Sequence, residues 1–73
     1  MSPLASPPVY LAELTYPAVE RLLSSDPIVL LPLGATEAHG PHLPLATDVY
    51  LSEEVARRTQ GALSQLGVAS VIA

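Results

Sequence analysis

The sequence contains no cysteine, tryptophan, phenylalanine or lysine among its 73 residues. Without cysteine it can form neither disulfides nor thiolate metal sites. Three arginines against seven acidic residues give a net charge of −4, which lacks the clustered positive charge that nucleic-acid phosphates require. No apolar run approaches the roughly 18 residues of a membrane span, and the N-terminus lacks the basic leader of a secretory signal. We therefore expect a cytoplasmic protein with no nucleic-acid or membrane partner.

Almost half of the residues are apolar and only 14% are charged, which is typical of a globular protein and not of a disordered one. Residues 1–10 are rich in serine and proline and are expected to form a loose arm. A domain of about 70 residues buries little surface and is marginally stable by itself. Because the sequence also ends on the apolar run "VASVIA", we expect residues 11–73 to be the N-terminal portion of a larger, truncated domain.

Two secondary-structure elements are expected before the centre of the chain. In "LTYPAVERLL", Thr15 is placed as an N-cap and Pro17 lies in the first turn, which predicts a short helix. The run "IVLLPL", residues 28–33, predicts a strand buried on both faces. Because Pro32 has no N–H to donate, pairing should fade towards the end of this strand.

The spacing of apolar residues after Asp48 predicts a helix that ends near Gly67, a suitable residue to follow a helix C-terminus. Two i,i+4 ion pairs, Glu53 with Arg57 and Glu54 with Arg58, should support it. The apolar residues that share one helical face are Leu51, Val55, Ala62 and Leu66, with Ala56 and Leu63 beside them.

The run "VASVIA" then predicts a second strand. The order strand, loop, helix, strand is that of a βαβ unit, whose two strands are parallel. The expected fold class is therefore α/β, with a mostly parallel sheet.

Four acidic or imidazole side chains gather on the loop between the first strand and the following helix. Glu37, His39, His42 and Asp48 lie in "LPLGATEAHGPHLPLATD", residues 31–48, where glycines and prolines prevent a regular helix. In open α/β sheets this loop is on the side where ligands bind, outside the carboxyl ends of the strands. Carboxylates combined with imidazole suit zinc, manganese or iron, whereas calcium prefers oxygen ligands alone.

Simpler interpretations exist for each residue of this cluster. Asp48 could cap the second helix, either histidine could be a structural or surface group, and Glu37 could be a solvated surface carboxylate. E-x-H by itself is a weak motif. A phosphate-binding loop is not supported, because neither G-x-x-x-x-G-K-[ST] nor G-x-G-x-x-G occurs.

The segment from Leu31 to Asp48 resembles the signature of the creatininase (creatinine amidohydrolase) family, whose pattern runs close to P-x-G-[SA]-x-E-x-H-G-P-H-L-P-x-x-T-D. The match is long and nearly unbroken, and the resemblance extends over residues 11–73. It implies an α/β/α sandwich, usually in a homo-oligomer. It also implies a metal-dependent hydrolase of amide-type C–N bonds in small-molecule substrates.

The resemblance further implies a site with two divalent ions, zinc or manganese, that activate a water. By position in the motif, Glu37 would bind one ion, His39 the other, and Asp48 would bridge both. His42 has no direct ligand role by this comparison and could orient a ligand or substrate. In the family, a further histidine and glutamate complete the site downstream, beyond the residues of this sequence.

The substrate stays open at this point. The family includes enzymes that open the ring of creatinine, deformylate a pyrimidine intermediate or cleave a modified peptide in redox-cofactor maturation. Because only part of the expected site is present, we expect the isolated chain to be inactive and poorly folded. The alternatives are a non-catalytic fragment or pseudoenzyme with a structural loop, and a module that binds a single metal ion.

Overall fold

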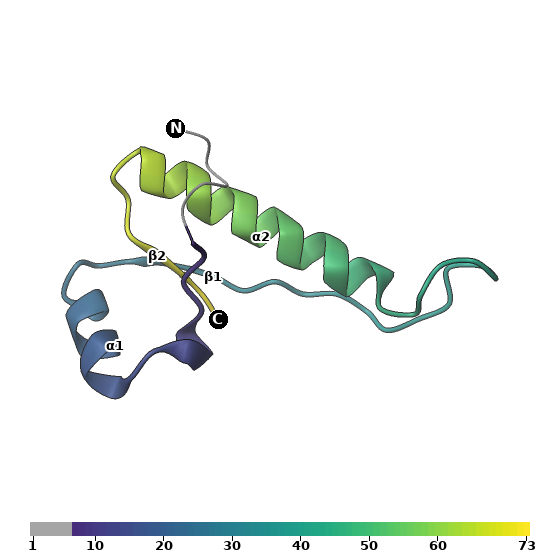
Figure 1. Ribbon diagram of the computed structural model, residues 1–73, viewed down its shortest axis with the longest axis horizontal. Helices are drawn as coiled ribbons and strands as arrows, with labels where there is room; N and C mark the ends of the chain where they lie inside the picture. Colours follow the sequence, from purple (N-terminus) through teal and green to yellow (C-terminus); the bar gives the residue numbers. More distant parts are fainter. Residues whose placement is uncertain (1–6) are drawn as a thin grey trace.

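The computed structural model describes residues 7–73 of the chain. Its elements are a 3₁₀ turn η2 (Leu11–Glu13), helix α1 (Tyr16–Leu23), strand β1 (Ile28–Leu30), helix α2 (Thr47–Gln65) and strand β2 (Ser70–Ile72). The two strands pair in parallel, with α2 as the crossover between them (Figure 1). This arrangement confirms the α/β class and the parallel strands expected from the sequence.

Helix α1 begins as the sequence predicts. The Thr15 hydroxyl accepts a hydrogen bond from the Ala18 N–H, and a proline occupies the first turn. The helix ends where two serine hydroxyls, from Ser24 and Ser25, donate to carbonyl oxygens one turn earlier. These bonds satisfy acceptors that a helix end leaves unpaired.

Helix α2 begins two residues earlier than expected, at Thr47. Both the N–H and the hydroxyl of Thr47 donate to the Pro44 carbonyl, so the chain turns into the helix before Asp48. The N-cap residue is Ala46, which makes no side-chain capping bond, and Asp48 lies inside the first turn. The interpretation of Asp48 as the N-cap is therefore wrong.

The C-terminus of α2 follows the prediction. Gly67 adopts a positive φ of 75°, a conformation that glycine accepts without steric cost. The Gly67 N–H donates to the Ser64 carbonyl at 3.0 Å, and the Val68 N–H donates to the Leu63 carbonyl at 2.9 Å. This pair of bonds is the Schellman motif that ends many helices.

The buried face of α2 differs from the expected one. Leu51, Val55, Ala62 and Leu66 are all exposed. The buried residues of the helix are Ala56, Gln60 and Gly61. The small residues Ala56 and Gly61 allow the helix to approach closely, and α2 packs against β2. The larger apolar residues of the predicted face therefore remain exposed and do not form the core.

The Gln60 side chain holds the N-terminal segment against the sheet. Its Oε1 accepts from the Val9 N–H at 2.8 Å, and its Nε2 donates to the carbonyls of Val9 and Ser70 at 3.2 and 3.0 Å. Tyr10 forms a parallel bridge with Ile72. The end of the expected arm thus lies along the outer edge of β2, and residues 1–6 lie outside the described residues.

Both strands are shorter than predicted. β1 ends at Leu30 and not at residue 33, and β2 covers only residues 70–72 of the expected 68–73. Pairing fades ahead of Pro32, in line with its missing donor. The expectation that β1 is buried on both faces is wrong, because Ile28 and Val29 are exposed.

One of the two predicted ion pairs on α2 is present. Arg58 Nε lies 3.0 Å from the Glu54 carboxylate, as expected. Arg57 also pairs with Glu54, at 3.6 Å, in place of Glu53. Glu54 therefore pairs with both arginines, which follow it at positions i+3 and i+4.

Among the described helices, neither is long and apolar enough to cross a membrane.

Candidate metal centre

The loop after β1 carries the candidate site. It runs alongside α2, passes beyond the N-terminal end of that helix and doubles back into it (Figure 1). The Glu37 N–H donates to the Leu45 carbonyl at 2.9 Å, which joins the outgoing and returning arms of the loop. Gly40, with a φ of 83°, makes the turn near the tip. The motif therefore folds into a closed loop anchored on the first turn of α2.

Gly34 brings the outgoing arm into contact with the helix. A Cβ at this position would lie 2.6 Å from the Val49 nitrogen and 2.8 Å from the Asp48 carbonyl carbon. Real Cβ atoms do not approach backbone this closely, so only glycine fits here. This contact places the residues that follow Gly34 beside Asp48, which is otherwise remote from Glu37 and His39 along the chain.

Three of the four polar residues converge. Glu37, His39 and Asp48 each offer one ligand atom, and these atoms all lie within 4.8 Å of one another. His39 Nε2 is central, at 3.5 Å from Asp48 Oδ1 and 3.8 Å from Glu37 Oε1. The same-side placement of Glu37 and His39 expected from the E-x-H spacing fits this geometry.

These distances are too long for hydrogen bonds, which join nitrogen and oxygen at about 2.7–3.2 Å. His39 Nε2 is in fact buried and has no hydrogen-bond partner among the described residues. Two ligands held about 2.1 Å from one tetrahedral zinc ion lie about 3.4 Å apart. The spacing and the unpaired imidazole nitrogen therefore fit a shared cation better than a direct contact.

The charge of the cluster also favours a cation. Within residues 7–73, His39 is the one basic side chain that pairs with Glu37 or Asp48. Two carboxylates so close together repel each other unless a positive charge lies between them. The His39 side chain is 23% exposed, against 40% for Asp48 and 57% for Glu37. The imidazole thus forms the floor of the site, and the carboxylates form its rim.

His42 lies outside this group. It is exposed near the tip of the loop, where its ring lies beside Gly40. The structure thus brings together Glu37, His39 and Asp48, which the family resemblance predicts as metal ligands, and leaves His42 outside the cluster. The role of His42 in orienting a ligand or substrate stays a prediction.

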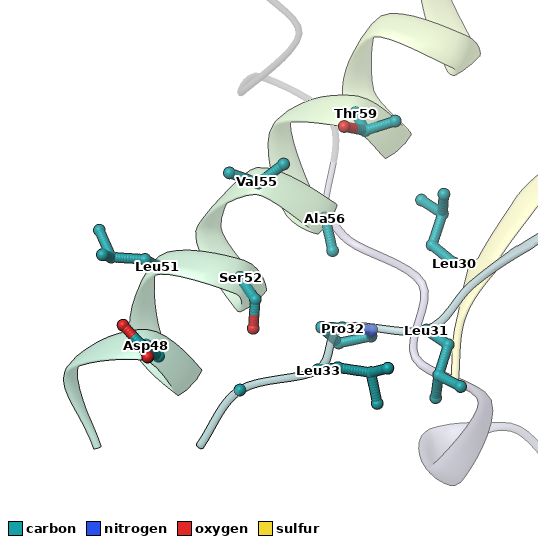
Figure 2. Close-up of a pocket in the computed structure, with 11 residues that line it drawn as sticks. Leu30, Leu31, Pro32, Leu33, Asp48, Leu51, Ser52, Val55, Ala56 and Thr59 are labelled. Carbon is teal, nitrogen blue, oxygen red and sulfur yellow. The ribbon is translucent and has the colours of Figure 1, made fainter. Parts of the chain in front are cut away.

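An apolar groove that the sequence did not predict lies next to the three ligand residues. It has a volume of about 590 Å³ and runs between residues 30–34 and one side of α2. Figure 2 shows Ser52 and Ala56 pointing from the helix towards Pro32, with Asp48 at the N-terminal end of the helix. The apolar run "LLPL" that predicted a buried strand was the available signal for it.

The fold and the three converging groups thus define an α/β protein with a candidate cation site at the carboxyl end of β1. Comparison with known families gives the class more closely. Residues 12–73 match the creatininase family, described as creatinine amidohydrolase. The chain belongs to the creatininase family, a family of hydrolases.

Similar curated proteins carry two kinds of name. The chain is 46% identical over 59 residues to "Mycofactocin precursor peptide peptidase" of Mycobacterium ulcerans, covering 75% of this chain and 24% of that protein. It is 39% identical over 51 residues to "Creatinine amidohydrolase" of Pseudomonas putida, covering 68% of this chain and 20% of that protein. The chain therefore spans about a quarter or less of the length of these relatives. No solved structure matches it significantly.

Proposed function

We propose that this chain supplies part of the active site of a metal-dependent hydrolase that cleaves amide-type C–N bonds. The observation that carries the proposal is the convergence of Glu37, His39 and Asp48, with the His39 nitrogen buried and unpaired. Membership of a hydrolase family supports the reaction class, because relatives are named as a peptidase and an amidohydrolase.

Each ligand residue has a definite task in this proposal. His39 presents the lone pair of Nε2, so it must be in its neutral form to bind a cation. Glu37 and Asp48 offset the positive charge of the ion, and Asp48 lies in the first turn of α2. When bound, a divalent ion such as zinc or manganese would act as a Lewis acid on an amide carbonyl and on the attacking water.

The number of ions is part of the proposal. By family resemblance, Asp48 would bridge two ions, with Glu37 on one and His39 on the other. A carboxylate has two oxygens and can bridge two ions, whereas one imidazole nitrogen cannot. Further ligands would be needed to hold a second ion. By the same family resemblance, we expect the complete protein to form a homo-oligomer.

A module that binds a single ion without catalysis is the second candidate. It is favoured by one observation: the three ligand atoms fall within 4.8 Å of one another, which suits one ion. It predicts one ion per chain and no amide hydrolysis. The hydrolase proposal predicts hydrolysis wherever the complete set of ligands is assembled.

The cation site can be tested by calorimetric titration of the chain with zinc or manganese. We expect His39→Ala to weaken binding by more than about 100-fold, beyond the 10–100-fold typical of losing an outer partner of a ligand. Glu53→Ala, an exposed carboxylate outside the cluster, is the control and should leave the affinity unchanged. Equal losses in the two variants would show that Glu37, His39 and Asp48 do not hold the ion.

The reaction class needs a complete site. A chimera in which residues 12–73 replace the matching segment of the Mycobacterium ulcerans peptidase should retain hydrolysis of that enzyme's peptide. Asp48→Ala in the chimera should abolish the reaction, whereas Glu53→Ala, an exposed carboxylate on the same helix, should not. A folded, metal-loaded chimera without activity would favour the single-ion module.

A further inference from the structure

We propose that Thr47 is a positioning residue for the candidate metal centre. Its side-chain hydroxyl fixes the turn by which the loop enters α2, and this turn holds the Asp48 carboxylate beside His39. The inference rests on the proposed cation site, and it adds to that site a residue that does not touch the ion.

The Thr47 hydroxyl makes the shorter of the two bonds that close this turn. It donates to the Pro44 carbonyl at 2.6 Å, near the short end of the usual range for a bond between two oxygens. The Thr47 N–H donates to the same carbonyl at 3.2 Å, at the long end of the range for a bond between nitrogen and oxygen. The turn over residues 44–47 therefore depends strongly on the hydroxyl.

The start of α2 lacks the usual side-chain cap within the described chain. Helices commonly begin at a residue whose side chain accepts a bond from an N–H of the first turn, as Thr15 does for α1. The N-cap residue of α2 is Ala46, which makes no such bond. Thr47 lies one residue later and bonds backwards to the loop. Its hydroxyl therefore joins the loop to the helix, where a cap would satisfy only the helix.

The same turn locates both carboxylates of the centre. Leu45 lies within the turn, and its carbonyl accepts from the Glu37 N–H at 2.9 Å. This bond fixes the arm of the loop that carries Glu37 and His39. Asp48 follows Thr47 directly, so a change in the turn moves Asp48 relative to that arm. The 3.5 Å between Asp48 Oδ1 and His39 Nε2 is thus set by the turn.

The ligand side chains have little support of their own. Among the side-chain hydrogen bonds of residues 7–73, none is made to the carboxylate of Glu37 or Asp48, and His39 Nε2 is also unpaired. Metal ligands are usually oriented by such outer partners. In this site the backbone turn orients Asp48, and the Thr47 hydroxyl is the side-chain group that holds the turn.

A purely structural role for Thr47 makes a different prediction. A bond that only stabilises the start of α2 would raise the stability of the fold and leave the metal affinity of the folded chain unchanged. A positioning role requires that metal affinity depend on the hydroxyl itself. It also requires that serine, which keeps the hydroxyl, be able to replace threonine.

Calorimetric titration of the 73-residue chain with zinc separates the two roles. Thr47→Val removes the hydroxyl and keeps a branched side chain, and it should weaken zinc binding about tenfold, the lower end of the effect of losing an outer partner. Thr47→Ser should bind zinc as tightly as the unmodified chain. Thr15→Val is the matched control, because it makes the same change at the start of α1, far from the loop (Figure 1), and should leave the affinity unchanged.

Circular dichroism shows whether Thr47→Val keeps its helices. If it does not, the same three substitutions are made in the chimera described above, where the rest of the Mycobacterium ulcerans peptidase completes the chain, and zinc affinity is measured there. Failure of Thr47→Val to fold in both proteins would show a structural role and overturn the inference.

The inference is also overturned if Thr47→Val binds zinc as tightly as the unmodified chain, or if Thr47→Ser loses as much affinity as Thr47→Val. An equal loss in Thr15→Val would overturn it as well, because general destabilisation would then be the cause. Failure of the proposed function is a separate result, in which His39→Ala leaves zinc binding unchanged. Zinc binding that His39→Ala loses and Thr47→Val retains overturns the positioning role alone.

Discussion

Strands β1 and β2 are three-residue apolar strands paired with each other, yet their surroundings differ. β2 lies between β1 and the N-terminal segment and packs against α2, so Val71 and Ile72 are 3% and 2% exposed. In β1, by contrast, Ile28 and Val29 are 45% and 57% exposed. The edge of β1 away from β2 has no strand beside it in the described chain. The two strands therefore have different roles. β2 contributes buried side chains to the core, and β1 leads into the loop that carries the candidate site.

The largest expected effect concerns this difference in burial. Ile72→Ala removes a buried side chain and should lower the free energy of unfolding by about 2–5 kcal/mol, enough to unfold a domain of this size. Val29→Ala, on the exposed strand, should change it by no more than about 0.5 kcal/mol. Urea denaturation followed by circular dichroism measures both. Comparable losses would show that β1 is covered in solution, by association or by another part of the chain.

The next prediction concerns the link between β1 and the metal centre. Gly34→Ala would place a Cβ against the backbone of Val49, and relieving that overlap should cost about 1–3 kcal/mol. The loop would have to move away from α2, so zinc binding measured by calorimetry should weaken markedly.

Gly67→Ala provides the matched control for this prediction. It also strains the backbone, because Gly67 has a positive φ, but a Cβ there meets nothing within 4 Å. It should cost about 1 kcal/mol and leave metal affinity intact. If both variants lost metal equally, general destabilisation and not the contact at Gly34 would be the cause.

The smallest expected effect lies on the exposed side of α2. Glu54→Ala removes two partly exposed ion pairs, with Arg57 and Arg58, each of a kind that stabilises helices by about 0.2–0.5 kcal/mol. Glu53→Ala should have less effect, since Arg57 pairs with Glu54 instead. Thermal unfolding at low and high salt tests this, because added salt should reduce the difference between the variants.

Much of the secondary structure was predictable from local signals. Thr15, Pro17 and Gly67 act through bonds and dihedral angles within a few residues, so their roles could be read from the sequence and are confirmed. The buried face of α2, by contrast, could not be predicted from local signals. Helical spacing identifies residues that share a side, but it does not say which side another element covers. Here the small residues near Gln60 allowed close packing, and the larger apolar residues were left outside.

For the candidate site too, the sequence predicted one part and the tertiary structure supplied the other. Carboxylate and imidazole side chains on one loop predicted a metal site from the sequence, and the family resemblance singled out Glu37, His39 and Asp48 among them. Their convergence depends on the Gly34 contact and on the bond from Glu37 to Leu45. The apolar groove likewise became visible only when residues 30–34 and α2 lay side by side.

The sequence by itself determined the types of element, the family and the chemical identity of the candidate ligands, since these depend on residue type and short-range spacing. Only the tertiary structure decided which apolar residues are buried, that His39 lies between two carboxylates, and that a groove leads to them. The physical reason is that burial and convergence arise from contacts between segments far apart along the chain. No local pattern specifies how closely two such segments approach.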